Sequence, residues 1–542
     1  MAPARTAAVV GAALVLLAAP AVAGHSYGSC VPTPTDRCER WSATIDDPDT
    51  TAPARSDQFG AGLVATDRLV VAVAKDVALN TDHPYSSTST ALLRGYDRTD
   101  GHLVWTATYA DRAYVNVTSA AASPDGSVIY ITGGAYNGYP VGGATDSQLL
   151  TAAFRASDGT RLWSAHWDGR PDATDNGKAI AVSPDGSEVY VGGVTTSALG
   201  DLDFVTAGYS AADGHALWSS VYSGPKSGGS DAVFGLAVNP VRDLLYVTGW
   251  SDGVVEYDAD YATVAYALGH GSPDSDGDPE GKGACKPPKG KGAGQDKDKG
   301  CPPPPVAGPA AGDQVWVARY DGVGQHKSDR ANAVAVSPDG SKVYVTGDSF
   351  SGPGGGEYGY ATVAYDATSG AQLWQARFAG GRGGFNSASH IVATATRVLV
   401  GGQASAPDAT NGNDATTVGY DAATGRQLWT SSIAALRSDD FLRDLVLAPD
   451  GQTAYALASD TPLVNYTALT RMTVTAYSVL DGTARWTSEL NAGALNALGG
   501  SALAVSPDGR SVAALGELKR SADPLGSRSQ NVYDLVAVAF AA

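Results

Sequence analysis

The chain has 542 residues, of which the 66 glycines and 29 prolines make up about 18%, against roughly 12% in average usage. Only 17% of residues are charged, yet the formal net charge is -19. This composition argues against coiled coils and helical bundles, which need Leu, Glu and Lys on a helical period. It also argues against a mostly disordered chain, because 43% of residues are hydrophobic. A nucleic-acid partner is disfavoured, since phosphate contacts need clustered Lys and Arg.

The first 23 residues are typical of a secretory signal peptide. Arg5 precedes an apolar run over 7–19, and Ala21-Val22-Ala23 supplies the small residues of a cleavage site before Gly24. The alternative is an uncleaved membrane anchor, for which the apolar run is short. We therefore predict a secreted, extracellular monomer with no membrane span, in which 24–38 form a leader segment.

Four cysteines are present, and an even count in an exported chain favours disulfides. The local pairs are Cys30–Cys38 and Cys285–Cys301, and the two crossed pairings remain open. The sequence contains no Cys-x-x-Cys motif, so zinc, thioredoxin-like and haem-attachment sites have no support.

A repeat of about 55–58 residues organises the rest of the chain. Its clearest marker is a tryptophan that recurs eight times; one interval of 98 residues contains a low-complexity insertion. The eight residues are Trp41, Trp105, Trp163, Trp218, Trp316, Trp374, Trp429 and Trp486.

Each repeat predicts four short strands in a fixed order. A small-residue strand such as 331–336 leads into a Ser-Pro-Asp-Gly turn, as at Ser337 to Gly340, and then into a strand such as 343–347. A third strand such as 360–365 ends in an aromatic–Asp–x–x–x–Gly turn before the Trp strand. Pro presets φ for a turn, Asp caps the backbone and Gly allows positive φ. Four antiparallel strands per repeat, repeated many times, predict a β-propeller.

The number of blades and the closure of the ring also follow from the repeat. The last unit stops after its third strand, over 533–540, and the N-terminus supplies an orphan Trp strand over 39–44. These two pieces complete one blade between them and remove the exposed edges of an open array. We predict an all-β, eight-bladed propeller over 39–542 with its last blade closed by the N-terminal Trp strand.

The run Tyr-Asp-Ala-Ala-Thr-Gly-Arg-Gln-Leu-Trp (Tyr420 to Trp429) resembles the tryptophan-docking repeat of pyrroloquinoline-quinone-type (PQQ-like) eight-bladed propellers. The strand start Asp-Tyr-Ala-Thr-Val (Asp260 to Val264) is similar to bacterial extracellular β-propeller repeats. The resemblance covers nearly the whole mature chain and is specific for architecture. It is weak for activity, because the same repeat serves enzymes, assembly factors and adhesins.

The repeat tryptophans have a structural and a functional interpretation. Eight-fold regularity favours packing between blades against the preceding Gly turn, since a ligand would need only one or two of them. Trp250 breaks the pattern, because it ends a Tyr-Val-Thr-Gly strand. It is a candidate for ligand stacking, with ordinary packing as the alternative.

The insertion over 269–312 replaces the turn between the third and fourth strands of blade four. It consists of Gly, Pro, Lys and Asp with almost nothing apolar, so it cannot bury a core. A surface tongue clipped by a disulfide is the preferred interpretation. A contact arm for cell wall or an acidic glycan is an alternative, as is a calcium loop, although its acids depart from the spacing of known calcium loops.

No catalytic motif emerges, because the sequence has no phosphate loop or His-Glu-x-x-His. The resemblance implies a quinone cofactor, but dehydrogenases of this architecture generally use an adjacent Cys-Cys pair that is absent here. We therefore predict no catalytic residues, no metal and no cofactor, with PQQ and calcium as the alternatives.

One polar position does recur, at the mouth of the innermost strand in five repeats. Carboxyl groups there either accept backbone N–H bonds from their own or the next blade, or form an acidic ring that holds a cation or a polyol. The residues at this candidate ligand ring are Asp175, Asp231, Asp329, Asn386 and Asp440.

These patterns favour a secreted, non-catalytic binding or scaffolding module for protein or glycan ligands. The alternative is an exported PQQ-like oxidoreductase or a carbohydrate-active enzyme with its site at the central channel mouth.

Overall fold

The computed structural model describes residues 39–541 except for segments between strands. Those segments are 46–54, 80–86, 138–145, 172, 256–257, 270–308, 323–326, 351–357, 382–383, 385, 407–411, 435–437, 463–470, 492–495 and 522–530. The predicted signal peptide, leader segment and most of the insertion lie outside the described residues, as do all four cysteines. The described residues contain no helix that could cross a membrane.

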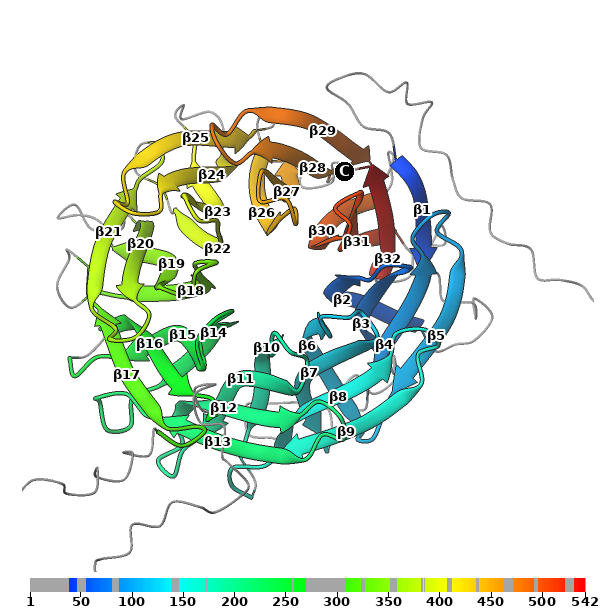
Figure 1. Cartoon of the computed structure of the whole chain (residues 1–542). Helices are drawn as coiled ribbons and strands as arrows, with labels where there is room; N and C mark the ends of the chain where they lie inside the picture. The colour runs from blue at the N-terminus through cyan, green and yellow to red at the C-terminus, as the bar shows by residue number, and fades with distance from the viewer. Residues whose placement is uncertain are drawn as a thin grey trace, which may run out of the picture.

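Eight four-stranded antiparallel blades surround a central channel (Figure 1). Blades 1 to 4 comprise β2 (Arg55–Ala65), β3 (Leu69–Leu79), β4 (Thr88–Asp97), β5 (Leu103–Tyr109); β6 (Tyr114–Ala122), β7 (Val128–Tyr136), β8 (Ser147–Arg155), β9 (Arg161–Trp167); β10 (Asp175–Val182), β11 (Glu188–Thr196), β12 (Leu202–Ser210), β13 (Ala216–Tyr222); and β14 (Asp231–Val238), β15 (Leu244–Asp252), β16 (Ala259–Ala267), β17 (Gln314–Tyr320).

Blades 5 to 8 comprise β18 (Asp329–Val336), β19 (Lys342–Phe350), β20 (Tyr358–Asp366), β21 (Gln372–Phe378); β22 (Ser387–Ala393), β23 (Arg397–Ser405), β24 (Asn413–Asp421), β25 (Gln427–Ile433); β26 (Ser438–Leu447), β27 (Thr453–Pro462), β28 (Arg471–Ser478), β29 (Ala484–Asn491); and β30 (Asn496–Val505), β31 (Ser511–Ser521), β32 (Asn531–Ala541) with β1 (Glu39–Ile45). In each blade the first strand lines the channel and the Trp strand lies at the circumference (Figure 1).

The two ends of the chain close the ring, as the sequence predicted. Strand β1 pairs antiparallel with β32, with Trp41 opposite Ala539. A bidentate ion pair adds to the closure, since the two guanidinium nitrogens of Arg98 in blade 1 lie 2.5 and 2.9 Å from the carboxylate oxygens of Asp508 in blade 8.

The repeat tryptophans pack between blades, but against the Gly turn of the following blade, whereas the sequence analysis had assigned the turn that precedes each Trp. The Trp374 ring lies on Gly425, which has φ +71°, and its Nε1 donates to the Ala422 carbonyl at 3.2 Å. The same bond joins Trp105 to Ala156 and Trp163 to Ala211, both at 2.9 Å. This contact, in which a Trp ring packs on the Gly turn of the next blade and its Nε1 donates to a carbonyl there, holds neighbouring blades together. We call it the latch.

The insertion removes one of these latches. Strand β16 ends at Ala267 and β17 begins at Gln314, so the insertion takes the place of the turn that would accept the Trp218 N–H. The Trp218 ring still packs against Gly312, but its buried Nε1 has no hydrogen-bond partner among the described residues.

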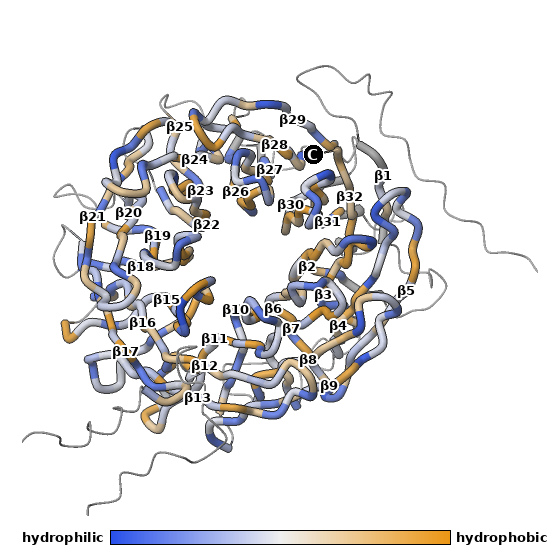
Figure 2. The backbone as a smooth tube through the Cα atoms, in the orientation of Figure 1, coloured by the Kyte–Doolittle hydropathy of each residue, from blue (hydrophilic) through white to orange (hydrophobic). Residues whose placement is uncertain are grey.

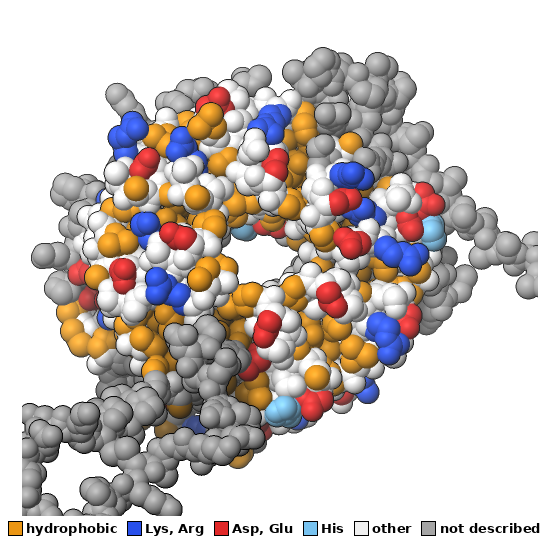
Figure 3. Space-filling view, in the orientation of Figure 1, with side chains coloured by type: hydrophobic (Ala, Val, Ile, Leu, Met, Phe, Trp, Pro, Cys, Tyr) orange, Lys and Arg blue, Asp and Glu red, His pale blue; other side chains and the backbone are white. Residues whose placement is uncertain are grey.

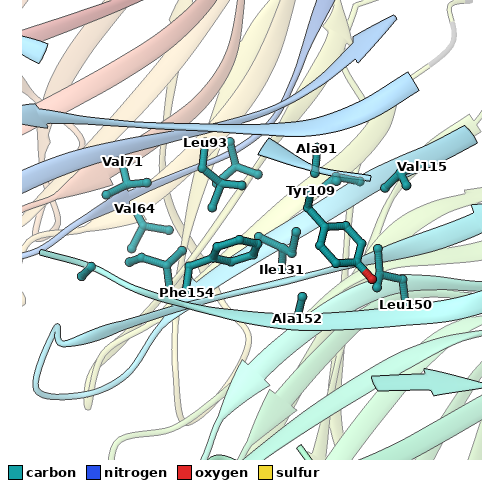
Figure 4. Packing of buried hydrophobic residues seen from close by; sticks show 14 of the residues in the cluster. Val64, Val71, Ala91, Leu93, Tyr109, Val115, Ile131, Leu150, Ala152 and Phe154 are labelled. Atoms are coloured by element: carbon teal, nitrogen blue, oxygen red, sulfur yellow. The ribbon is translucent and has the colours of Figure 1, made fainter. Parts of the chain in front are cut away.

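Apolar cores fill the spaces between neighbouring blades. Between blades 1 and 2, Val71 and Leu93 pack against Ile131 and Phe154, all of them at most 1% exposed (Figure 4). Both faces of the middle strands are covered by other blades, so β16 is buried along its whole length. Figure 2 shows hydrophobic stretches in strands all around the ring.

The two faces of the ring differ in their connections. One face carries the tight turns after the first and third strands, in which Gly126 (φ +68°) and Gly370 (φ +70°) occupy the left-handed positions. The opposite face carries the connections after the second and fourth strands, which vary in length from blade to blade. We call this second surface the long-loop face; the inner strands begin there.

Candidate binding site in the central channel

Every inner strand contains a β-bulge at the same place, just below the long-loop face. In blade 3 the register shifts between Gly177 and Ala179, which leaves Lys178 without a partner on β11, and the other seven inner strands shift in the same way. A bulged residue is rotated out of the ladder, so its side chain is re-aimed. The eight residues, which we call the bulge ring, are Ala61, Thr118, Lys178, Phe234, Asn332, Ser389, Arg443 and Ser501.

The bulge explains the Tyr-Val-Thr-Gly motif of the second strands. Gly249 lies beside the bulge of blade 4, and a Cβ there would overlap the Ala232 carbonyl oxygen. Gly347 is held in the same way by the Arg330 carbonyl. Glycine at this position lets the inner strand approach closely enough to form the bulge.

The predicted ligand ring lies three residues before the bulge ring, and its side chains face the protein. Asp175, Asp231, Asp329, Asn386 and Asp440 are all at most 3% exposed. The Gly224 amide donates to Asp231 at 2.6 Å and the Gly322 amide to Asp329 at 2.7 Å. These side chains thus hold the connection that enters each inner strand by accepting hydrogen bonds from its backbone amides, and we call them clamps. Their role as a ligand ring stays a prediction.

Asn386 occupies the same position in blade 6 with the same bonds. Its Oδ1 accepts from the Gly380 amide at 3.2 Å and from the Ser405 amide at 2.8 Å. Burial raises the pKa of both Asp231 and Asp329 to about 6. A neutral amide at this position in blade 6 agrees with a site that disfavours charge.

The bulge ring is where side chains are exposed to the channel. Phe234 is 51% exposed although its neighbours Val233 and Gly235 are buried, and Lys178 and Arg443 are also exposed. Because the free edge of each inner strand faces the channel, these side chains meet solvent there. Figure 3 shows the channel as an opening that passes through the molecule.

Cation–aromatic pairs gather at this level of the channel. The Lys75 ammonium lies 4.8 Å from the centroid of the Phe59 ring, the Arg443 guanidinium 5.1 Å from Phe441, and the Arg330 guanidinium 5.8 Å from Trp250. Phe59 and Lys75 are opposite each other on β2 and β3, beside the bulge of blade 1. Trp250, the predicted stacking residue, therefore lies against an arginine of the next blade, and ligand stacking on it stays a prediction.

Two arcs of this ring place cations near a carboxylate. In blades 7, 8 and 1, burial raises the pKa of Glu517, and the charges of Arg443 and Lys75 partly offset this increase. In blades 3 to 5, burial raises the pKa of Asp348, and the charge of Arg330 partly offsets it. Burial also lowers the pKa of Lys178.

A smaller polar group lies between blades 6 and 7. The Ser389 Oγ is 2.8 Å from the His390 Nδ1, and the His390 Nε2 is 3.8 Å from Asp444. The Asp444 carboxylate accepts the amides of Leu445 and Leu503, both at 2.7 Å, so it ties blade 7 to blade 8. Burial lowers the pKa of His390.

The candidate residues predicted from the sequence did not include the bulge ring, although the variation of one position within the repeat indicates it. In the five blades with the periodic Asp or Asn, the side chain three residues later is different each time: Lys178, Phe234, Asn332, Ser389 and Arg443. A position that varies inside a regular repeat is one that the common packing of the repeat does not determine.

A surface groove of about 700 Å³ is also present between blades 1 and 2. It lies among the tight turns, and its lining includes Arg68, Asp97, Val104, Asp125 and Leu162. Asp97 and Asp125 accept hydrogen bonds within their own turns from Thr99 and Ser127.

The sequence itself matches a family described as "Outer membrane protein assembly factor BamB" over residues 33–275 and 307–498. The chain belongs to this family. It is a PQQ-like β-propeller. None of the curated proteins matches it.

Solved structures similar to this PQQ-like propeller include dehydrogenases and a WD40 domain. A quinohemoprotein alcohol dehydrogenase from Comamonas testosteroni is 12% identical over 94% of this chain and 76% of that chain, with a TM-score of 0.46. A europium-containing methanol dehydrogenase is 11% identical over 89% and 92%, with a TM-score of 0.41. The C-terminal WD40 domain of Sif2 is 10% identical over 93% and 98%, with a TM-score of 0.43.

In the described part of the channel, no group of three acids or histidines lies close enough to share a cation. The two groups of described acids and histidines close enough to share a cation are Asp97–Asp100–His102 and Asp258–Asp260–Asp321. Both belong to the third and fourth strands of their blades and their connections, away from the channel. In the channel, Glu517 already accepts the Gly60 amide at 3.1 Å.

Proposed function

We propose that this PQQ-like propeller is an exported, non-catalytic binding module whose ligand enters from the long-loop face and contacts the bulge ring. Export rests on the predicted signal peptide. The observation that carries the binding function is Phe234, a large apolar side chain that is 51% exposed in the middle of an inner strand.

The construction of the channel supports this proposal. The clamps and latches hold each inner strand in place, while the bulge residues Lys178, Phe234 and Arg443 have exposed side chains. A rigid scaffold with variable side chains at one level suits recognition, because little conformational entropy is lost when the ligand binds.

Replacing Phe234 with alanine tests this function directly. We expect the wild-type protein to bind at least one class of saccharide on a glycan array, and Phe234→Ala to weaken that binding at least tenfold, since an aromatic contact surface is lost. The matched control is Leu199→Ala, which removes a 71% exposed side chain from a surface connection of blade 3. Equal binding by Phe234→Ala and wild type would contradict the channel site.

The alternative function, an exported PQQ-like oxidoreductase, has family membership in its favour. Adding PQQ and calcium to the purified protein and recording its absorption spectrum separates the two. A stoichiometric bound chromophore together with alcohol-dependent reduction of a dye would overturn the non-catalytic proposal, whereas an unchanged spectrum is the expected result.

A further inference from the structure

We propose that the carboxylates of Asp258, Asp260 and Asp321 bind one calcium ion, which joins β16 to β17 at the long-loop end of blade 4. One ligand oxygen from each residue lies within 4.8 Å of the other two. Oxygens on opposite sides of a calcium ion are about 4.6–5.2 Å apart, at bond lengths of about 2.3–2.6 Å. Strands β16 and β17 are the two outer strands of the blade (Figure 1). The site is therefore separate from the bulge ring and independent of the proposed binding function.

The strand register explains why these side chains meet. Tyr261 pairs with Tyr320, so the residues one step farther along the two strands, Asp260 and Asp321, lie opposite each other. Asp258 reaches the same place from the end of the connection that enters β16. Like charges directly opposite each other on paired strands destabilise a sheet, so this arrangement favours a cation between them.

The matched positions of blades 2 and 3 contain a hydrogen-bond donor where blade 4 has a second acid. In blade 2, the Gln148 Nε2 donates to Asp168 at 2.9 Å. In blade 3, Ser223 forms a side-chain hydrogen bond with Asp203. Two ionised carboxylates have no proton to share, so the facing pair of blade 4 lacks the bond that the other two blades form.

Arg319 satisfies only part of this group. Its guanidinium lies 2.8 Å from the Asp260 Oδ2 and also donates to the Ser251 Oγ at 2.7 Å and the Ser251 carbonyl at 2.9 Å. Asp260 is only 9% exposed, and its other oxygen, Oδ1, is buried without a hydrogen-bond partner among the described residues. A buried carboxylate oxygen without a partner is costly, and a bound cation removes that cost.

The repeat does not need these acids for its own packing. Arg377 occupies the position of Arg319 in blade 5 and donates to the Ser349 Oγ at 2.8 Å. The two facing positions of that blade are Gly359 and Ala379. The arginine is thus held there without a facing acid, so the paired acids of blade 4 are an addition to the common structure.

Charge and ligand type together select calcium. Among the four groups, three carboxylates and one guanidinium leave two negative charges, which one divalent cation neutralises. The group contains no histidine or cysteine, and oxygen ligands suit calcium and magnesium. Magnesium demands a near-ideal octahedron at about 2.0–2.1 Å, whereas calcium accepts irregular geometry. Carboxylates fixed at the ends of two paired strands have little freedom to rearrange, which favours calcium.

The place of the site within the ring has a structural reason. Strand β16 ends at Ala267 and β17 begins at Gln314, so the insertion, in place of a tight turn, connects these strands at the opposite face. A longer connection costs more entropy to close. A calcium ion at the long-loop end holds the same two strands together and offsets that cost.

Calorimetric titration of the chelator-treated protein with calcium chloride tests the inference. We expect one ion per chain with a Kd of about 0.1–1 mM, the range of extracellular calcium modules. Asp321→Ser, which copies Ser223 of blade 3, should remain folded and bind calcium roughly tenfold or more weakly, because one charged ligand is lost. Calcium should raise the midpoint of thermal unfolding of the wild type but not that of Asp321→Ser.

The matched control is Asp203→Asn, which changes the equivalent acid of blade 3 and should bind calcium as the wild type does. A second control, Asp276→Asn combined with Asp278→Asn, removes two acids of the insertion and should also bind normally. Loss of binding in this second control but not in Asp321→Ser would place the ion in the insertion and overturn the inference. Equal calcium affinity of Asp321→Ser and wild type, tighter binding of magnesium than of calcium, or no binding at about 10 mM calcium would overturn it as well.

Discussion

Replacing Trp374 with alanine should lower the free energy of unfolding by about 3–5 kcal/mol, the range for removing a large aromatic side chain from a core. The Trp374 ring fills the space between blades 5 and 6 against Gly425, and it lies 5.7 Å from the Tyr344 ring, measured between centroids. Its loss opens a cavity at a joint that keeps two blades in register. Equilibrium unfolding in guanidinium chloride, followed by far-ultraviolet circular dichroism, measures the change.

A comparison of two conservative variants separates the latch bond from the ring packing. Trp374→Phe loses the N–H bond to the Ala422 carbonyl, whereas Trp218→Phe loses no such bond, because the buried Trp218 Nε1 has no partner among the described residues. Trp374→Phe should therefore cost about 1 kcal/mol more than Trp218→Phe. Equal losses would mean that the hydrogen bond does not contribute to the latch.

Replacing Asp329 with asparagine should stabilise the protein at neutral pH, by up to about 2 kcal/mol. Burial raises the native pKa of Asp329 to about 6, whereas the unfolded chain releases this proton near pH 4. Between these values the native state binds more protons, so the free energy of unfolding falls as pH rises from about 4 to about 6. Asparagine keeps a neutral group there at every pH, as Asn386 does in blade 6.

Two further variants make this prediction specific. Asp329→Ala should destabilise the protein by about 2–4 kcal/mol, because the amides of Gly322 and Phe350 lose their acceptor. Asp339→Asn should change the pH dependence of stability in the opposite direction. Hydrogen bonds from Ser337 and Ser341 lower the pKa of Asp339 to about 2. The Asp339 carboxylate therefore adds to the free energy of unfolding above pH 4, and this stabilisation is lost as pH falls toward 2. Unfolding titrations from pH 3 to 8 measure both. An Asp329→Asn variant whose free energy of unfolding depends on pH as in the wild type would contradict the raised pKa of Asp329.

The functional consequence of this architecture is a separation of tasks along each inner strand. The residue at the start of the strand is buried and clamps the connection, as Asp231 does with Gly224. Three residues later, the bulge exposes a side chain such as Phe234 to the channel. Changing the second residue should alter binding with little effect on folding, whereas changing the first should alter stability.

Much of the fold could be predicted from local signals. The turn residues Asp339 and Gly340, the alternation in strands such as β20 and the spacing of the tryptophans depend on neighbours in the chain, so they are visible in the sequence. The pairing of β1 with β32 was also predictable, because a missing strand at one end and a surplus strand at the other leave one way to close the ring.

The positions of side chains relative to the channel depended on contacts that the sequence does not display. Asp175 and Lys178 are three residues apart on one strand, and the sequence allowed the acid either to accept backbone N–H bonds or to line the channel. In the structure the Gly169 amide donates to Asp175 at 2.9 Å, and the bulge rotates Lys178 out of the ladder.

The sequence by itself determined the blade number, the strand order and the closure of the ring, because each of these repeats or completes a local pattern. Only the tertiary structure decided that each Trp docks on the following blade, and that the lysine and phenylalanine of blades 3 and 4 reach the channel. The physical reason is that both depend on how neighbouring blades pack against each other and on a bulge in the inner strand, which in blade 4 lies beside Gly249 of the adjoining strand.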